Sequence, residues 1–329
     1  MKKILLIDAY SQIFRAFYAI RSLNNSRGEP VNAAYVFTKL LLKLEKLYPT
    51  GLGAMLFDCG KVDFRLKLAP DYKANRPPMP DALKSQMPLV KKIAAAFGWQ
   101  LLSQSGYEAD DLIGAIVCQN RQDSRIYVVS SDKDLSQLVD ENVSMLVPVS
   151  GGKGDFEVRD SAAVQKKFGV PPELIVDYLA LLGDSSDNIA GIPGIGPKSA
   201  VELLTQFGPA GCWLENPELL ENCRFKNKLS GNEELLKRNI ELVRLRCEMP
   251  DDWSRDPEKL LKKEPPDWAE IAAICRDNQF NSILKELPEI PEEKAETVEA
   301  EVDLFSFIQP ELAAEADAGA KEPQQLELF

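Results

Sequence analysis

The sequence contains no histidine, no closely spaced pair of cysteines and no long apolar run, and each absence excludes a class of protein. Without imidazole, any chemistry has to rely on metal ions, carboxylates, lysine or arginine. Six scattered cysteines without a CxxC pair predict reduced thiols in a cytoplasmic protein. No stretch approaches the ~20 apolar residues that a membrane-spanning helix needs. The apolar start runs into Asp8, which favours a strand over a signal peptide.

The net charge of −12 at first argues against nucleic-acid binding, but the charge is distributed unevenly. Residues 291–329 carry 11 acidic and 2 basic groups, a net of −9, which leaves −3 for the first 290 residues. If the nine clustered carboxylates described below are set aside, those 290 residues have a surplus of six positive charges. We therefore predict a mildly basic body and a disordered acidic tail over residues 289–329.

Short β-rich runs at 2–8, 53–58 and 125–131 each end at an acidic or hydroxyl cluster, and helical patterns lie between them. Strands that alternate with helices predict a parallel sheet covered on both faces, with ligands bound beyond the carboxyl ends of the strands. We expect residues 1–160 to form this α/β core and residues 161–288 to form a mainly helical subdomain. Further expectations are a strand at 143–148, a loop at 150–154, and helices at 36–48, 81–98, 108–120, 171–183, 197–208, 232–245 and 266–286.

Nine acidic residues stand in small clusters just after apolar runs or at helix starts. They are Asp8, Asp58, Glu108, Asp110, Asp111, Asp132, Asp134, Asp184 and Asp187. Like charges gathered this closely cannot all stay ionised unless cations join them, and oxygen-only ligands suit Mg²⁺ or Mn²⁺. We therefore predict a phosphodiester hydrolase with two or more ions that activate water and stabilise charge on the phosphate. For any single acid, capping a helix remains the alternative.

A basic segment with aromatic rings, FRLKLAPDYKANRPPMP, lies between two of the acidic clusters. Its arginines and lysines can hold phosphates, and Tyr72 can stack on an unpaired base. The alternative is a solvated basic loop.

A glycine-rich turn between two helices is predicted at GIPGIGPKSA, residues 191–200. Its glycines allow close backbone approach, and the N–H groups of the next helix start can bind a phosphate. The alternative is a plain helix hairpin of an all-α domain. The DNA-binding candidates in this turn are Gly191, Gly194, Gly196, Lys198 and Ser199.

Six stretches, in family order over roughly residues 1–205, resemble the bacterial 5′-nuclease family. This family comprises the N-terminal nuclease domain of DNA polymerase I and its flap endonuclease relatives. The stretches are LLIDAYSQIFRAFYA, FDCGKVDFR, DYKANRPPMPDAL, GYEADDLIG, SSDKDLSQLV and LALLGDSSDNIAGIPGIGPKSA. The resemblance implies a three-layer, PIN- or Rossmann-like core with a helical arch at about 64–90. A helix–turn–helix subdomain that binds duplex DNA would follow, with K⁺ at its turn.

The resemblance also implies individual roles. It places Asp8, Asp58, Glu108, Asp110 and Asp111 nearest a first metal site, and Asp132, Asp134, Asp184 and Asp187 around a second. It implies that Arg15, Lys73 and Arg76 contact the scissile phosphate. Tyr72 would stack on the end nucleotide, and Arg65 would bind DNA.

The last five residues, QLELF, resemble the short peptide by which bacterial proteins dock on the β sliding clamp. Apolar anchors would enter a groove while a glutamine fixes the orientation. The residues concerned are Gln325, Leu326, Leu328 and Phe329. The segment EVDLFSF at 301–307 is interpreted as a weaker second copy, and chance apolar residues are the alternative for both. Since no polymerase or proofreading domain follows, we expect a stand-alone nuclease.

These observations predict a Mg²⁺-dependent 5′→3′ exonuclease and 5′-flap endonuclease that acts on DNA and RNA primers in replication and repair. We expect a cytoplasmic, nucleoid-associated monomer. The open alternative is a non-catalytic DNA junction-binding protein or clamp adaptor with the same fold. A phosphatase of the haloacid type would need DxD after the first strand, where this chain has Asp8-Ala9-Tyr10.

Overall fold

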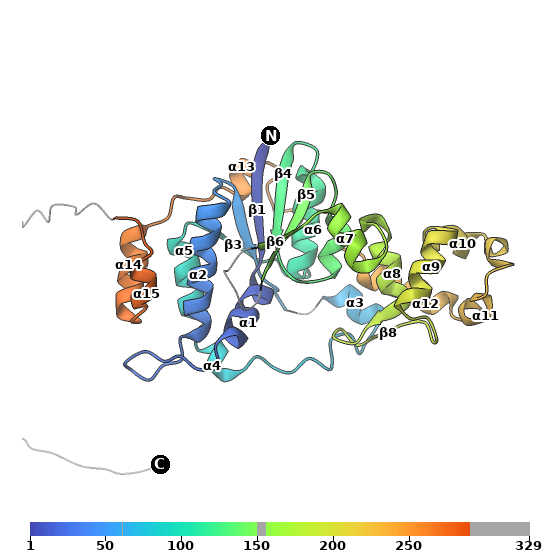
Figure 1. Cartoon of the computed structure of the whole chain (residues 1–329), viewed down its shortest axis with the longest axis horizontal. Coiled ribbons are helices and arrows are strands. Elements are labelled where there is room, and N and C mark those ends of the chain that lie inside the picture. Colours follow the sequence, from blue (N-terminus) through green and yellow to red (C-terminus); the bar gives the residue numbers. More distant parts are fainter. Residues whose placement is uncertain (61, 150–155, 290–329) are drawn as a thin grey trace, which may run out of the picture. The chain divides into compact units, whose positions relative to one another are not determined.

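The computed structural model describes residues 1–60, 62–149 and 156–289. Its centre is a six-stranded sheet in the order β3-β2-β1-β4-β5-β6 (Figure 1). The strands are β1 Lys2–Asp8, β2 Gly53–Leu56, β3 Gln100–Leu102, β4 Ser124–Val129, β5 Val143–Pro148 and β6 Phe156–Arg159. Strands β1 to β5 pair in parallel, and β6 is antiparallel to β5. The predicted parallel sheet and its four predicted strands are confirmed, whereas β3 and β6 were not predicted.

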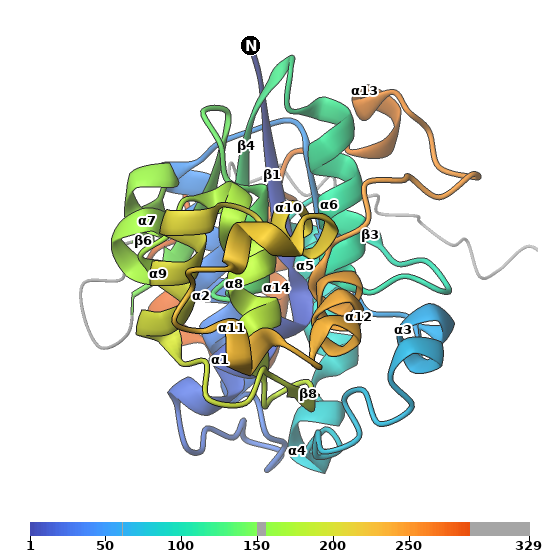
Figure 2. The ribbon, with the colours of Figure 1, turned by 90° about the vertical axis from the view of Figure 1, so that its right-hand side faces the viewer.

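Helices cover both faces of the sheet, because successive strand residues point to opposite sides. Leu5 and Ile7 of β1 pack with one group of helices, and Ile4 and Leu6 pack with the other. The first group is α1 Ala9–Ala19, α2 Asn32–Leu47, α5 Met87–Ala96 and α14 Trp268–Asp277. The second group includes α6 Ala109–Asn120 and α8 Ile175–Leu182. The core is therefore two apolar layers separated by the sheet. Figures 1 and 2 show the helices on both sides of it.

The second half of the described chain is mainly helical, as expected, and α8 packs against α9 and α12 there (Figure 2). A two-stranded ribbon, β7 Gly183–Asp184 and β8 Ile189–Ala190, follows α8. The helices of this part are α7 Ser161–Phe168, η2 Pro172–Leu174, α9 Pro197–Phe207, α10 Ala210–Glu215, η3 Pro217–Leu220, α11 Lys226–Leu229, α12 Glu233–Val243, α13 Pro257–Leu260 and α15 Asn281–Leu284. Elsewhere lie α3 Asp63–Leu68, α4 Asp81–Lys84 and the 3-10 helix η1 Asp134–Leu138.

The prediction of a single helix at 81–98 is wrong, because the chain forms two separate helices there, α4 and α5. Pro88 stands in the first turn of α5, where its missing N–H costs nothing. Gln86, between the two helices, turns inward and its Oε1 accepts the N–H groups of Ala33 and Ala34 at 2.9 and 3.2 Å. The N-cap residue of α2, Val31, makes no side-chain hydrogen bond to the helix, and Gln86 caps the helix start in its place. Similarly, the pattern at 266–286 divides into α14 and α15.

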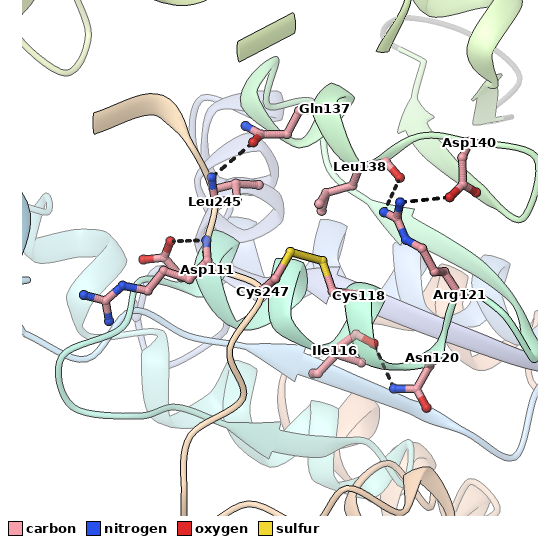
Figure 3. The surroundings of a disulfide bond; sticks show 11 residues. Asp111, Ile116, Cys118, Asn120, Arg121, Gln137, Leu138, Asp140, Leu245 and Cys247 are labelled. Carbon is pink, nitrogen blue, oxygen red and sulfur yellow. Dashed lines mark hydrogen bonds and ion pairs between the residues drawn. A yellow bond between two sulfur atoms is a disulfide. The ribbon is translucent and has the colours of Figure 1, made fainter. Parts of the chain in front are cut away.

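The prediction of six reduced thiols is wrong for one pair. Cys118 of α6 forms a disulfide with Cys247, 129 residues further along the chain (Figure 3). Cys59, Cys212, Cys223 and Cys275 are free. Tertiary proximity, not sequence spacing, creates this pair.

Among the described residues, no helix is both long and apolar enough to cross a membrane. The predicted loop at 150–154, the segment at 301–307 and the four clamp-binding residues lie outside the described residues.

Candidate active site

A pocket of about 350 Å³ opens at the edge of the sheet where the parallel strands end. Asp8 ends β1, Asp58 follows β2 and Asp132 follows β4, so the strand order itself brings these three carboxylates to one edge. Asp110 and Asp187 complete the acidic lining, and Lys73 and Arg76 are its cations. The remaining lining residues are Tyr10, Ser11, Phe14, Met79 and Ala109.

The first acidic group lies at the start of α6. Oxygens of Glu108, Asp110 and Asp111 lie within 4.8 Å of one another. Glu108 caps the helix, Asp111 completes a capping box, and Asp58 Oδ1 accepts the Ala109 N–H at 2.7 Å. Negative charge is favourable at a helix N-terminus, so the start of α6 helps to hold these carboxylates together.

The second acidic group joins the core to the helical part of the chain. Oxygens of Asp134, Asp184 and Asp187 lie within 4.8 Å of one another. Asp134 begins η1 after strand β4, whereas Asp184 and Asp187 belong to the turn around the β7–β8 ribbon. Lys133 Nζ lies 3.0 Å from Asp184 Oδ2 and ties the two segments together.

Two cations from the segment after α3 face these carboxylates. Lys73 Nζ lies 2.7 Å from Glu108 Oε1 and 3.9 Å from Asp187 Oδ2. Arg76 pairs with Asp187 Oδ1. Lys73 has a positive φ of 57°, which is uncommon for a residue with a side chain, and its N–H donates to the Asp187 carbonyl at 3.0 Å. The backbone is therefore bent to bring this lysine to the carboxylates.

Arg65 is an internal counter-ion in this structure, and its binding to DNA stays a prediction. Its side chain is 1% exposed and reaches Asp111 with two nitrogens, at 2.6 and 2.8 Å. It also lies 3.0 Å from Glu108 Oε2 and donates to the Leu242 carbonyl at 3.1 Å. No donor on its guanidinium faces solvent, so a phosphate cannot reach it in this structure.

Tyr72 is also buried in this structure, and its stacking on a nucleotide stays a prediction. Only 9% of its surface is exposed. Its hydroxyl lies 3.1 Å from Glu108 Oε2 and 3.2 Å from Asp187 Oδ2, between the two acidic groups. In this structure the ring packs in one of the two apolar clusters of the core.

Burial and mutual repulsion disturb the titration of the carboxylates. Burial and the charge of Asp132 raise the pKa of Asp8 to about 7, and burial and Asp132 raise that of Asp134 to about 8. Burial and Asp111 raise the pKa of Asp110 well above its usual range. At Asp184, burial opposes ionisation, but hydrogen bonds from Ser186 and Lys133 outweigh it and lower the pKa.

The residues present fit a hard divalent cation. The donors are carboxylate oxygens gathered in two groups, and burial together with repulsion from Asp132 raises the pKa values of Asp8 and Asp134. A cation of high charge would relieve this repulsion.

The remaining predicted residues lie apart from the pocket lining. Arg15 is half-buried on α1. Lys198 and Ser199 stand in the first turn of α9, which Pro197 begins. A Cβ on Gly191 would lie 2.1 Å from the Leu182 carbonyl oxygen, and Gly194 has a φ of +77°, so the turn requires glycine at both positions. Gly196 is the N-cap of α9.

Sequence reasoning missed Ser130 and Lys133, which both contact carboxylates of the site. Their position inside SSDKD, beside Asp132 and Asp134, was the available signal.

Comparison with known proteins identifies the family and the fold of this chain. Residues 3–169 match the family model described as 5′-3′ exonuclease, N-terminal resolvase-like domain. Residues 170–268 match 5′-3′ exonuclease, C-terminal SAM fold. Among solved structures, T5 5′-exonuclease with bound zinc has a TM-score of 0.60 at 24% identity, with 88% of this chain and 100% of that chain covered. A DNA and metal-ion complex of the T5 D15 flap endonuclease has a TM-score of 0.59 at 24% identity, with 87% and 98% covered.

Curated relatives share more of the sequence. The 5′-3′ exonuclease of Aquifex aeolicus is 36% identical over 292 residues, which cover 88% of this chain and 96% of that protein. The thermostable DNA polymerase I of Thermus filiformis is 35% identical over 286 residues, or 87% of this chain. The chain spans only about a third of that polymerase's length. On the family match and these identities, the chain belongs to the 5′-3′ exonuclease family.

Proposed function

We propose that this protein is a Mg²⁺- or Mn²⁺-dependent 5′→3′ exonuclease that also cuts 5′ flaps on DNA and removes RNA primers in replication and repair. The observation that carries the proposal is the pocket at the sheet edge. It combines carboxylates from two acidic groups with Lys73 and Arg76. Carboxylates that hold metal ions, together with cations that can face a phosphate, are what phosphodiester hydrolysis requires.

The two acidic groups would each hold a divalent ion. Asp8, Asp58, Glu108 and Asp110 would serve a first ion, and Asp132, Asp134, Asp184 and Asp187 a second. When bound, such ions supply a nucleophilic water at neutral pH and stabilise charge on the phosphate. Asp111 would act indirectly, because Arg65 and backbone N–H groups occupy both of its oxygens.

Lys73 and Arg76 would change partners when substrate arrives. They now neutralise Glu108 and Asp187, the same carboxylates that would contact metal ions. Once those carboxylates bind cations, the lysine and arginine become available to the scissile phosphate, with Arg15 as a further candidate. Charge-assisted contacts of this kind offset the negative charge that develops during cleavage.

The turn at 191–200 would hold the duplex part of the substrate. Lys198, Ser199 and the free N–H groups at the start of α9 offer contacts to phosphates without reading sequence. We propose K⁺ at this turn, a division into a core at 1–160 with its arch at 64–90, and a helical DNA-binding subdomain at 161–288. A monomeric, cytoplasmic and nucleoid-associated enzyme fits a DNA substrate.

A labelled 5′-flap DNA with Mg²⁺ tests the catalytic proposal. Asp110→Asn and Asp184→Asn, one from each acidic group, should each lower the cleavage rate by at least about a hundredfold while the protein stays folded. Glu234→Gln is the matched control, since Glu234 is exposed and pairs only with Lys237 among the described ion pairs. Cleavage that survives both aspartate changes would refute the role of these carboxylates, whereas no cleavage by the unchanged protein would favour the junction-binding alternative.

We also propose that the C-terminal QLELF docks on the β sliding clamp. Its support is the sequence alone: two apolar anchors and a glutamine follow an acidic segment. Deletion of residues 325–329 should abolish clamp binding in surface plasmon resonance and leave cleavage of free flap DNA unchanged. Equal clamp affinity of the truncated and complete chains would refute the docking role.

A further inference from the structure

Ser130 is a fully buried residue that touches both sides of the acidic site. It is the first residue after β4, and none of its surface is exposed. Its Oγ donates to Asp8 Oδ2 at 2.8 Å and accepts the N–H of Asp132 at 3.1 Å. Asp8 ends β1, the strand that pairs with β4. One hydroxyl therefore connects the carboxyl ends of two adjacent strands through Asp8 and Asp132, which both line the pocket.

The direction of these bonds is set by the partners available. A serine hydroxyl has one proton, and the Asp132 N–H uses a lone pair of the oxygen, so the proton is directed to an acceptor. The carboxylate of Asp8, at 2.8 Å, is nearer than Ser11 Oγ, at 3.4 Å. The other oxygen of Asp8 accepts the Ser11 N–H at 3.2 Å. Both carboxylate oxygens are thus held, and the plane of the group is defined.

The same chain of bonds continues to the second acidic group. Asp132 Oδ1 accepts the N–H of Asp134 at 3.0 Å, and Asp134 lies beside Asp184 and Asp187. Loss of the Ser130 hydroxyl would leave Asp8 with one fewer donor and the Asp132 N–H without its acceptor. The spacing between Asp8 and the second acidic group would then be less well defined.

We propose that Ser130 is a positioning residue of the divalent-ion site, whose hydroxyl sets the Asp8 carboxylate and the Asp132 turn in the arrangement that binds a cation. This inference rests on the metal site proposed above. Loss of a hydrogen-bond partner behind a metal ligand typically costs about 10–100-fold in metal affinity or activity. If the serine were purely structural, its replacement would instead lower the stability of the protein and leave the cation affinity of the folded state unchanged.

Calorimetric titration of the complete, DNA-free protein with Mn²⁺ tests the inference. Ser130→Ala should bind Mn²⁺ about tenfold more weakly than the wild type. The Mg²⁺ concentration for half-maximal flap cleavage should rise by a similar factor, with the KM for DNA unchanged. Ser130→Thr, which keeps the hydroxyl, should recover the affinity.

Ser144→Ala is the matched control. Ser144 is equally buried, in the neighbouring strand β5, and its Oγ accepts from Arg125 Nη2 at 3.2 Å, away from the carboxylates. Its Mn²⁺ affinity should equal that of the wild type. If Ser130→Ala does not fold, Ser130→Cys decides the question, because it keeps the shape with a weaker donor. Wild-type Mn²⁺ affinity in the Ser130 variant overturns the inference, whereas a wild type that binds no Mn²⁺ overturns the metal site itself.

Discussion

Arg65 is the side chain on which the acidic group at the start of α6 depends, because its guanidinium lies among the carboxylates. Burial works to lower the pKa of Arg65, but the hydrogen bond to Asp111 and the charges of Asp110 and Glu108 outweigh it and raise the pKa. The cation is therefore always present, and Asp111, with no exposed surface, stays paired. A buried charge that loses such a partner is not solvated by water in its place, so the folded state is destabilised.

We expect Arg65→Ala to lower the free energy of unfolding by about 3–5 kcal/mol, because Asp111 would be left buried and uncompensated. Arg27→Ala is the control: Arg27 also pairs with two carboxylates, Glu29 and Asp277, but all three side chains are well exposed. That variant should unfold almost as the wild type does. Chemical denaturation with EDTA present measures both, and equal losses in the two variants would contradict the distinction between buried and exposed pairs.

At the scale of elements, α6 is held against the segment that follows α12. The Cys118–Cys247 disulfide joins them directly (Figure 3). Beside it, the Arg246 N–H donates to Asp111 Oδ1 at 3.3 Å, and the Leu245 N–H donates to Gln137 Oε1 at 3.1 Å. The segment after α12 is thus attached to α6 by one covalent bond and one hydrogen bond, and to η1 by a second hydrogen bond.

Replacing both Cys118 and Cys247 by serine should lower the free energy of unfolding by about 2–4 kcal/mol, since the bond closes a long loop in the unfolded chain. Dithiothreitol should produce a similar loss in the wild type and none in the double variant. Cys212→Ser, at an exposed free thiol, is the control and should have no such effect. Peptide mapping of unreduced protein that finds no link between residues 118 and 247 would refute the pairing.

At the scale of the whole molecule, the acidic pocket links stability to pH and to metal ions. The pKa values of Asp8 and Asp134 rise from 3.8 to about 7 and about 8. The folded protein then holds protons that the unfolded chain has already released at the same pH. Asp184 does not oppose this between pH 5 and 8, since its pKa is lowered and it is ionised in both states. The absence of histidine removes the usual competing titration in this range.

We therefore expect the free energy of unfolding of the metal-free protein to fall as pH rises from about 5 to 8, by at most ~1.4 kcal/mol per pH unit for each such group. Saturating Mg²⁺ should remove the trend, because the bound ions keep these ligands deprotonated in the folded state, which then holds as few protons as the unfolded chain. Urea unfolding at three pH values, with EDTA and with Mg²⁺, measures both slopes. Stability that rises with pH in EDTA would contradict the raised pKa values.

Local patterns were sufficient to predict much of the fold. The runs at 2–8 and 125–131 are strands because β-rich apolar segments suit a buried parallel sheet, and the break after each run places an acid at the sheet edge. The same reasoning failed for 81–98, where the helix breaks so that Gln86 can cap α2, a contact across more than 50 residues. No local sequence pattern predicts a contact between residues so far apart in the chain.

The chemistry of the site was determined by the sequence itself, since only carboxylates, lysine and arginine were available once histidine was absent. The tertiary structure decided the role of each of these side chains. Arg65 and Lys73 stand in the same basic segment and look alike in the sequence. Arg65 is nevertheless buried and paired with Asp111, whereas Lys73 lines the pocket. The difference arises from residues far along the chain, including Asp111 and Leu242. Burial and pairing depend on such distant partners, which residue types and spacing do not encode locally.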